Sequence, residues 1–90
     1  MKVLVVDDNR VDRVHIRRIV ERMPQGYTVD EAGDAGEALL RLLDEEYVCV
    51  FLDFMLPDMN GAELIRTLFE RMTEAPPIIL LSNSDDENTI

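Results

Sequence analysis

Three aspartates of this sequence follow apolar segments in a pattern that suggests chemistry. Asp7 and Asp8 come directly after the apolar run of residues 3–6, and Asp53 comes directly after the run 48–52. Taken alone, the Asp7–Asp8 pair could simply cap a following helix. A carboxylate at the end of a central, nearly buried strand is costly unless it is paired or bound to a metal. We therefore expect the three aspartates to form one functional site.

Such a cluster favours a cation and permits phosphoryl chemistry. Carboxylates a few ångströms apart repel one another, and Mg²⁺ relieves the repulsion while leaving room for water and a phosphate ligand. The same ion neutralises the oxygens of a transferring phosphoryl group, and a neighbouring carboxylate can act as the nucleophile and form an acyl phosphate. Ser82 follows the apolar run 78–81 and could donate a hydrogen bond to a phosphoryl oxygen. A serine in this place is also a common turn residue or helix cap.

Four short segments have the composition of strands that could carry these side chains. Residues 3–6, 48–52 and 78–81 are apolar at consecutive positions, which is typical of central strands in a parallel sheet covered on both faces. Residues 27–31 alternate between apolar and polar side chains, which is typical of an edge strand.

Amphipathic patterns typical of helices lie between the strands. Apolar residues recur at three- and four-residue spacing over residues 16–23, 35–43 and 65–72. Capping residues stand three positions before a Glu in three pairs: Asp34 with Glu37, Asn60 with Glu63, and Ser84 with Glu87. The order is β-α-β-α-β-α-β and then the first residues of another helix. This order predicts an α/β fold with a doubly wound parallel sheet, in which ligands bind at the carboxyl ends of the strands.

The composition narrows the function classes. The 90 residues contain 19 Asp and Glu against 9 Lys and Arg, for a net charge of −10, which argues against direct nucleic-acid binding and against a polybasic membrane surface. The longest apolar run, residues 48–52, is far shorter than the roughly 20 residues that span a bilayer. The single cysteine, Cys49, permits no intrachain disulfide, and we expect a buried thiol in a cytoplasmic protein.

Three segments carry a resemblance to a known family. Residues 4–9 (LVVDDN), 51–61 (FLDFMLPDMNG) and 77–82 (PIILLS) resemble the response-regulator receiver domain of two-component signalling, which is CheY-like, and the resemblance covers the whole chain. The Asp-x-x-x-Pro-Asp-x-Asn-Gly segment is the most specific of the three. The resemblance implies a flavodoxin-like fold with strand order 2-1-3-4.

The resemblance also implies roles for individual residues. Asp53 would be the phosphoacceptor, and Asp7, Asp8 and Asp53 would bind Mg²⁺, with Mn²⁺ as a substitute. The backbone carbonyl of Met55 would be a further metal ligand. Ser82 would be the switch hydroxyl that closes on the phosphoryl group.

Loop geometry and partners follow from the same resemblance. Pro57, with its fixed φ, and Gly61, which permits a tight entry into the following helix, would shape the loop after Asp53. The phosphoryl donor would be a phosphohistidine of a histidine kinase or phosphotransfer protein. The chain would be a signalling phosphoacceptor that catalyses only its own phosphoryl transfer and dephosphorylation, and not an enzyme for other substrates.

The sequence departs from the family at its C-terminal end. Receiver domains continue to a fifth strand with a lysine that pairs with the phosphoryl group, and then to a fifth helix. The single lysine of this chain, Lys2, begins the first strand and cannot take that role. We therefore expect residues 1–90 to be a receiver domain that stops at the start of the fourth helix. We expect its phosphoryl transfer to be impaired, and the exposed sheet edge to favour a homodimer or a swapped oligomer.

The sequence keeps one alternative to the phosphoacceptor open and argues against two others. A receiver-fold interaction module that works without phosphorylation would also fit, and the absent lysine favours it. A haloacid-dehalogenase-like phosphatase expects a second Asp where Met55 stands, and an EF-hand expects ligands that the segment after Asp58 lacks.

On the first predicted helix, His15 is expected to be a surface residue. The arginines around it could be a solvated face or part of a kinase-docking surface.

Overall fold

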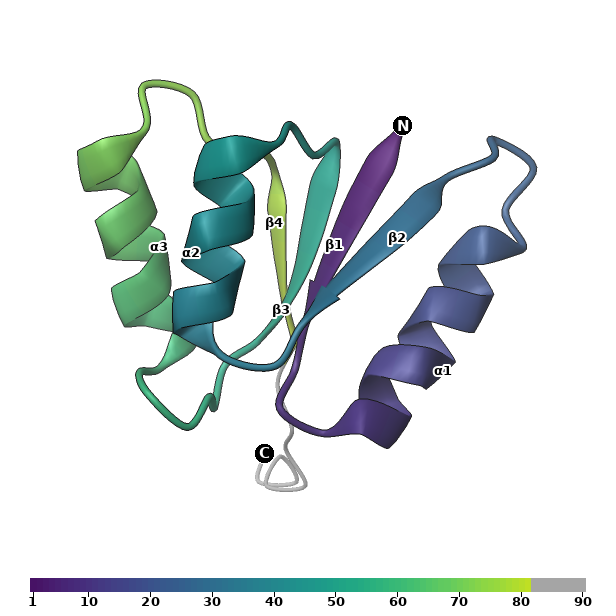
Figure 1. Ribbon diagram of the computed structural model, residues 1–90, viewed down its shortest axis with the longest axis horizontal. Coiled ribbons are helices and arrows are strands. Elements are labelled where there is room, and N and C mark those ends of the chain that lie inside the picture. The colour runs from purple at the N-terminus through teal and green to yellow at the C-terminus, as the bar shows by residue number, and fades with distance from the viewer. Residues whose placement is uncertain (82–90) are drawn as a thin grey trace, which may run out of the picture.

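The computed structural model describes residues 1–81, and it contains a parallel sheet with helices on both faces (Figure 1). The elements in chain order are β1 (Lys2–Val6), α1 (Arg10–Glu21), β2 (Thr28–Ala32), α2 (Ala35–Asp44), β3 (Cys49–Asp53), α3 (Gly61–Arg71) and β4 (Ile78–Leu81). The strand order is β2-β1-β3-β4, and each neighbouring pair is parallel. The predicted doubly wound α/β fold and its 2-1-3-4 order are therefore confirmed.

Two apolar clusters fill the two sides of the sheet. The larger cluster lies on the face where α2 and α3 pack against Leu4, Val6, Val50 and Leu52. On the other face Val3 and Val5 pack with Val20 of α1 in a smaller cluster. The alternation of side chains along β1 explains the division, because successive residues of a strand point to opposite faces. The strand is thus apolar on both sides, as the run of residues 3–6 predicts.

The helices begin where short polar side chains bind their first N–H groups. The Asn9 side chain accepts hydrogen bonds from the N–H groups of Val11 and Asp12 and caps α1. Asp34 caps α2 through the Glu37 N–H. Asn60 and Glu63 form a complete capping box at the start of α3. The predicted pair Ser84 and Glu87 lies outside the described residues.

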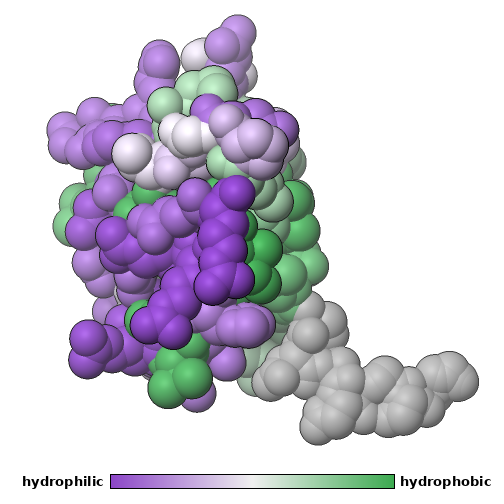
Figure 2. Space-filling model, turned by 90° about the vertical axis from the view of Figure 1, so that its right-hand side faces the viewer, coloured by the Kyte–Doolittle hydropathy of each residue, from purple (hydrophilic) through white to green (hydrophobic). Residues whose placement is uncertain are grey.

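Within residues 1–81, the face of the sheet beside α1 is only partly covered. α1 packs against β1 and β2, and Figure 2 shows hydrophobic surface next to the hydrophilic helix. Cys49 on β3 is half-buried there and not buried, so the prediction of a buried thiol was wrong; its side chain packs at the margin of the smaller cluster and is not enclosed by it. Ile79 and Leu80 of β4, the outermost strand in this part of the chain, are each 45% exposed. No helix among the described residues has the length and apolar character needed to cross a membrane.

Candidate metal centre

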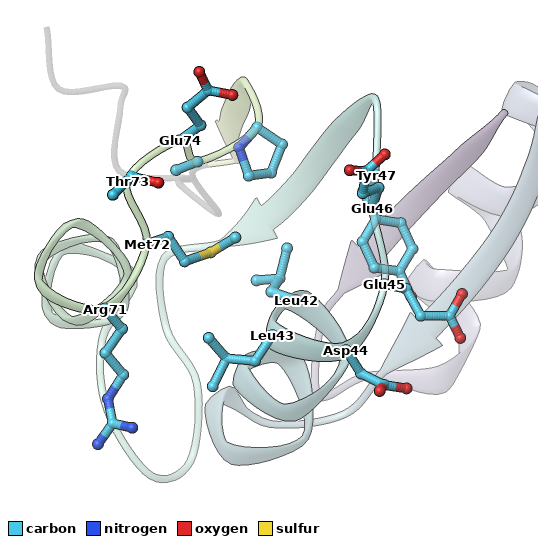
Figure 3. A pocket seen from close by; sticks show the side chains of 12 residues that line it. Leu42, Leu43, Asp44, Glu45, Glu46, Tyr47, Arg71, Met72, Thr73 and Glu74 are labelled. Carbon is cyan, nitrogen blue, oxygen red and sulfur yellow. The ribbon is translucent and has the colours of Figure 1, made fainter.

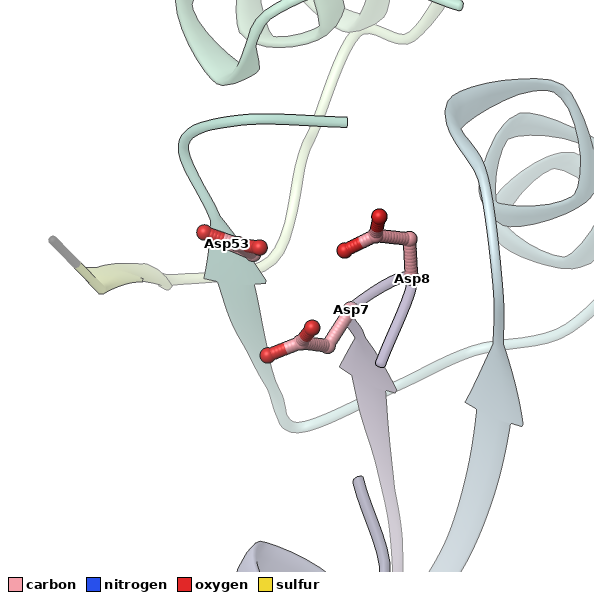
Figure 4. A group of neighbouring side chains, drawn as sticks. All are labelled: Asp7, Asp8 and Asp53. Carbon is pink, nitrogen blue, oxygen red and sulfur yellow. The ribbon is translucent and has the colours of Figure 1, made fainter. Parts of the chain in front are cut away.

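The three aspartates of the sequence prediction meet at the carboxyl edge of the sheet. β1 and β3 are direct neighbours with Val6 opposite Leu52, so the residues that follow, Asp7 and Asp53, lie side by side. Asp8 is the next residue along the turn, and each of the three offers a carboxylate oxygen within 4.8 Å of the others. Figure 4 shows the three side chains gathered at the ends of these two strands.

Burial sets the electrostatics of this cluster. Asp7 is 7% exposed and Asp53 is 9% exposed, whereas Asp8 faces solvent. Burial raises the pKa of Asp7, and the nearby charges of Asp53 and Asp8 raise it further. Burial also raises the pKa of Asp53, with a smaller contribution from the charge of Asp8. Both carboxylates are therefore held in surroundings that disfavour their charged form.

Each buried carboxylate has one backbone hydrogen bond that partly offsets this effect. The Asn9 N–H donates to Asp7 Oδ1 at 2.9 Å, and the Met55 N–H donates to Asp53 Oδ1 at 3.3 Å. Among residues 1–81, no salt bridge includes any of the three clustered aspartates. Several carboxylate oxygens converging without a cationic side chain form a donor set that fits a hard divalent ion such as Mg²⁺.

The loop after Asp53 is fixed by the start of α3. Residues Met55 and Asn60 form an isolated antiparallel bridge, and the Gly61 N–H donates to the Phe54 carbonyl at 2.7 Å. A Cβ atom on Gly61 would lie 3.2 Å from Phe54 Cα and 3.0 Å from Leu80 Cδ1. Gly61 thus permits a close approach between α3 and the end of β3, and no positive φ is involved. Pro57 lies within this loop and is exposed.

Asp58 has a structural role that the sequence pattern did not reveal. Its carboxylate accepts hydrogen bonds from the N–H groups of Ala35 and Gly36, both at 2.9 Å. These two bonds lower the pKa of Asp58 and join the β3–α3 loop to the first turn of α2. Asp34 and Glu37 gave a local cap signal for this helix. No local spacing points to a second cap that comes from more than 20 residues away.

Other residues singled out in the sequence lie outside this centre. Ser82 and Ser84 lie beyond the described residues. His15 is exposed on α1, as expected. Of the α1 arginines, Arg17 pairs with Glu21 at 3.0 Å, which fits a solvated helix face.

The end of β3 is also bonded to β4. The Phe54 N–H, one residue beyond Asp53, donates to the Leu81 carbonyl at 3.1 Å. Asp53 lies opposite Leu81 in the register of these two strands. The candidate centre is therefore connected to the last described residue of the sheet.

A cavity of about 700 Å³ lies away from this centre, beside the amino ends of β3 and β4 (Figure 3). Leu42, Leu43 and Met72 form its apolar lining, and Glu46 and Glu74 contribute carboxylates. None of the clustered aspartates lines it. The clustered aspartates thus lie at an open edge of the sheet and not in this cavity.

Fold and site together define a class of protein. The family model for the response regulator receiver domain matches residues 3–90. The chain therefore belongs to the receiver domains of two-component response regulators, whose members are signalling phosphoacceptors.

Particular relatives support this assignment. The transcriptional regulatory protein ResD of Bacillus subtilis is 37% identical over 86 residues, which is 96% of this chain and 34% of ResD. The chain thus spans about a third of the length of that relative. The response regulator TrrA of Thermotoga maritima, solved in complex with Mg²⁺ and BeF, is 27% identical with a TM-score of 0.83, over 98% of this chain and 74% of TrrA. TrrA in complex with the histidine kinase ThkA is 29% identical with a TM-score of 0.79, over 98% of this chain and 78% of that one.

Proposed function

We propose that Asp53 accepts a phosphoryl group from a phosphohistidine, with Mg²⁺ bound by Asp7, Asp8 and Asp53. The observation that carries the proposal is the convergence of three carboxylates within 4.8 Å at the carboxyl edge of the sheet. Two of them are buried, and burial raises the pKa of both carboxyl groups, with smaller contributions from neighbouring aspartate charges. The backbone carbonyl of Met55 is the proposed further metal ligand, and Ser82 is the proposed switch hydroxyl.

The reaction is a direct transfer between nitrogen and oxygen. An oxygen of the Asp53 carboxylate attacks phosphorus, the new O–P bond forms an acyl phosphate, and the P–N bond breaks with its electrons returning to the imidazole. The hydrogen bond from Met55 N–H holds one oxygen of Asp53, which orients the carboxylate for this attack. A divalent ion held by Asp7, Asp8 and Asp53 would supply positive charge that offsets the negative charge of the phosphoryl group.

The proposed partners follow from the same chemistry. The donor is a histidine kinase or a phosphotransfer protein in the cytoplasm, and the complex of TrrA with the kinase ThkA is a precedent for such a pairing. Mn²⁺ is proposed as a substitute ion, since it also accepts oxygen ligands. The acidic chain, with its net charge of −10, is proposed to contact proteins and not nucleic acid directly.

The test is phosphorylation of the purified chain by a small-molecule phosphodonor with Mg²⁺, followed by intact-mass measurement. We expect the mass of one added phosphoryl group on the wild type, and none on Asp53→Asn. Asp44→Asn, which removes an exposed carboxylate at the end of α2, is the matched control and should be modified normally. An addition that persists in Asp53→Asn contradicts the proposal. No addition to the wild type would favour an interaction module that works without phosphorylation.

A further inference from the structure

The peptide group between Asp7 and Asp8 decides where the exposed ligand of the metal centre points. Asp7 is buried and bonded to the Asn9 N–H, so its side chain is already held. Asp8 is exposed, and among residues 1–81 its carboxylate takes part in no salt bridge. The orientation of Asp8 therefore depends on the backbone that carries it.

Arg13 of α1 forms a hydrogen bond to the peptide group between Asp7 and Asp8. Its guanidinium Nη1 donates to the Asp7 carbonyl oxygen at 2.7 Å, which is the oxygen of the Asp7–Asp8 peptide group. The side chain of Arg13 is only 18% exposed. A Cβ atom on Gly33 would lie 3.4 Å from Nη1, so the guanidinium fits closely against the turn that follows β2.

The Arg13 guanidinium is also fixed by a hydrogen bond to β2. Arg13 Nε donates to Glu31 Oε1 at 3.0 Å, and Glu31 lies on β2 opposite Val5 of β1. The other oxygen of Glu31 accepts from Arg17 Nη1 at 2.7 Å. A planar guanidinium with donors on two edges can bridge two acceptors, which an ammonium group cannot do with the same geometry.

We propose that Arg13 is a positioning residue for the metal centre, which acts by holding the Asp7–Asp8 peptide against β2. Its guanidinium links the Glu31 carboxylate to the Asp7 carbonyl and thereby sets the direction of the Asp8 carboxylate. The inference rests on the proposed function, because it concerns the affinity of that centre for Mg²⁺. It assigns Arg13 no contact with the ion or with the phosphoryl group.

The sign of the expected effect separates positioning from simple electrostatics. Removing a positive charge near an acidic site should by itself strengthen Mg²⁺ binding, because the ion loses a repulsive neighbour. Loss of a group that orients a metal ligand should instead weaken Mg²⁺ binding. Removal of a residue that hydrogen-bonds to a metal ligand commonly lowers the metal affinity by about tenfold or more. Weaker binding after removal of Arg13 thus points to its role in orientation.

The experiment measures the Mg²⁺ dissociation constant of the full chain by isothermal titration calorimetry. We expect Arg13→Met to weaken binding by about tenfold. Arg17→Met is the matched control, since it removes the same charge from the same helix and also a Glu31 partner, but it does not touch the Asp7 carbonyl. Its affinity should stay the same or become slightly tighter. Arg13→Lys keeps the positive charge but lacks the planar guanidinium with donors on two edges. Its Mg²⁺ affinity should lie between those of wild type and Arg13→Met.

Urea unfolding without metal checks that each variant is folded. If Arg13→Met does not fold, Arg13→Lys serves instead, because it keeps the positive charge but cannot bridge Glu31 and the Asp7 carbonyl with the same geometry, and its Mg²⁺ affinity should also fall. Wild-type affinity in Arg13→Met, or in Arg13→Lys when that variant is used, overturns the inference. A wild-type chain that binds no Mg²⁺ would instead contradict the proposed function itself.

Discussion

Two pairs of carboxylates on neighbouring strands have opposite surroundings. Asp30 and Glu31 on β2 have partners: the Tyr47 hydroxyl donates to Asp30 at 2.6 Å, and two arginines donate to Glu31. The pKa of Asp30 is lowered mainly by the bond from Tyr47, and that of Glu31 mainly by the bond from Arg17. Burial and the hydrogen bond to Asp30 raise the pKa of Tyr47 to about 12.

Asp7 and Asp53 show the reverse pattern. They are more buried than the β2 pair, they take part in no salt bridge among residues 1–81, and burial raises the pKa of both. Folding therefore stabilises the charged form of the β2 carboxylates and destabilises the charged form of the other two. The comparison teaches that the first pair serves the fold, while the second pair costs stability and is available for a cation.

The largest expected effect is a gain of stability when the acceptor is neutralised. The folded-state pKa of Asp53 is raised above 3.8, so the free energy of unfolding falls as the pH rises through that raised pKa and remains lower at pH 7. Asp53→Asn removes the buried charge and should raise the free energy of unfolding at pH 7 by about 1.5 kcal/mol. Urea unfolding without metal, followed by circular dichroism, measures it.

The pH dependence supplies the control for this variant. The difference between Asp53→Asn and wild type should shrink as the pH falls through the raised pKa of Asp53, because the wild-type carboxyl then takes up a proton and loses its buried charge. Asp44→Asn, at an exposed position, should stay within about 0.5 kcal/mol of wild type at every pH. A less stable Asp53→Asn would mean that the acceptor is stabilised by its neighbours, and the contrast between the two pairs would fail.

The second expected effect is stabilisation of the wild type by Mg²⁺. An ion that binds the folded state alone adds about 1.4 kcal/mol at a free concentration ten times its dissociation constant. Asp7→Asn and Asp53→Asn should lose most of this gain, whereas Glu31→Gln should keep a measurable part of it. Thermal unfolding across a Mg²⁺ series measures the shift. Equal stabilisation of wild type and both aspartate variants would show that the ion binds elsewhere.

The smallest expected effect comes from the paired carboxylate. Glu31→Gln weakens two ion pairs that are partly shielded from solvent and should lower the free energy of unfolding by about 1 kcal/mol at pH 7. The folded-state pKa of Glu31 is lowered, so its contribution is present above pH 4.5 and is lost as the pH falls through the lowered value. Urea unfolding at pH 7 and in acid measures both results.

Glu21→Gln is the matched control, because it removes only the exposed partner of Arg17 on the same helix. It should cost about 0.3 kcal/mol. A larger loss from Glu21→Gln than from Glu31→Gln would show that pairing on β2 does not stabilise the fold.

The sequence was sufficient to predict the part of the site that depends on strand order. Apolar runs that end in Asp7–Asp8 and Asp53 place these side chains at one edge of any parallel sheet in which the two strands are neighbours. The caps at Asp34 and Asn60 were likewise predictable, since each donor lies within three residues.

Contacts between distant segments could not be predicted in the same way. The bond of Arg13 to the Asp7 carbonyl depends on how α1 lies against the turn after β1, and the bonds of Asp58 depend on the packing of α2 beside α3. The partial exposure of Cys49 has the same origin, because an apolar run gives no information on which helix covers each part of a strand.

The hydrogen bond from Phe54 to Leu81 has a mechanical consequence. The peptide plane that carries this N–H is the one that joins Asp53 to Phe54, so a rotation of the Asp53 backbone also turns the N–H away from the Leu81 carbonyl. A change in the backbone of Asp53 therefore alters a hydrogen bond to the end of β4. Hydrogen–deuterium exchange at the Phe54 amide would report that movement directly.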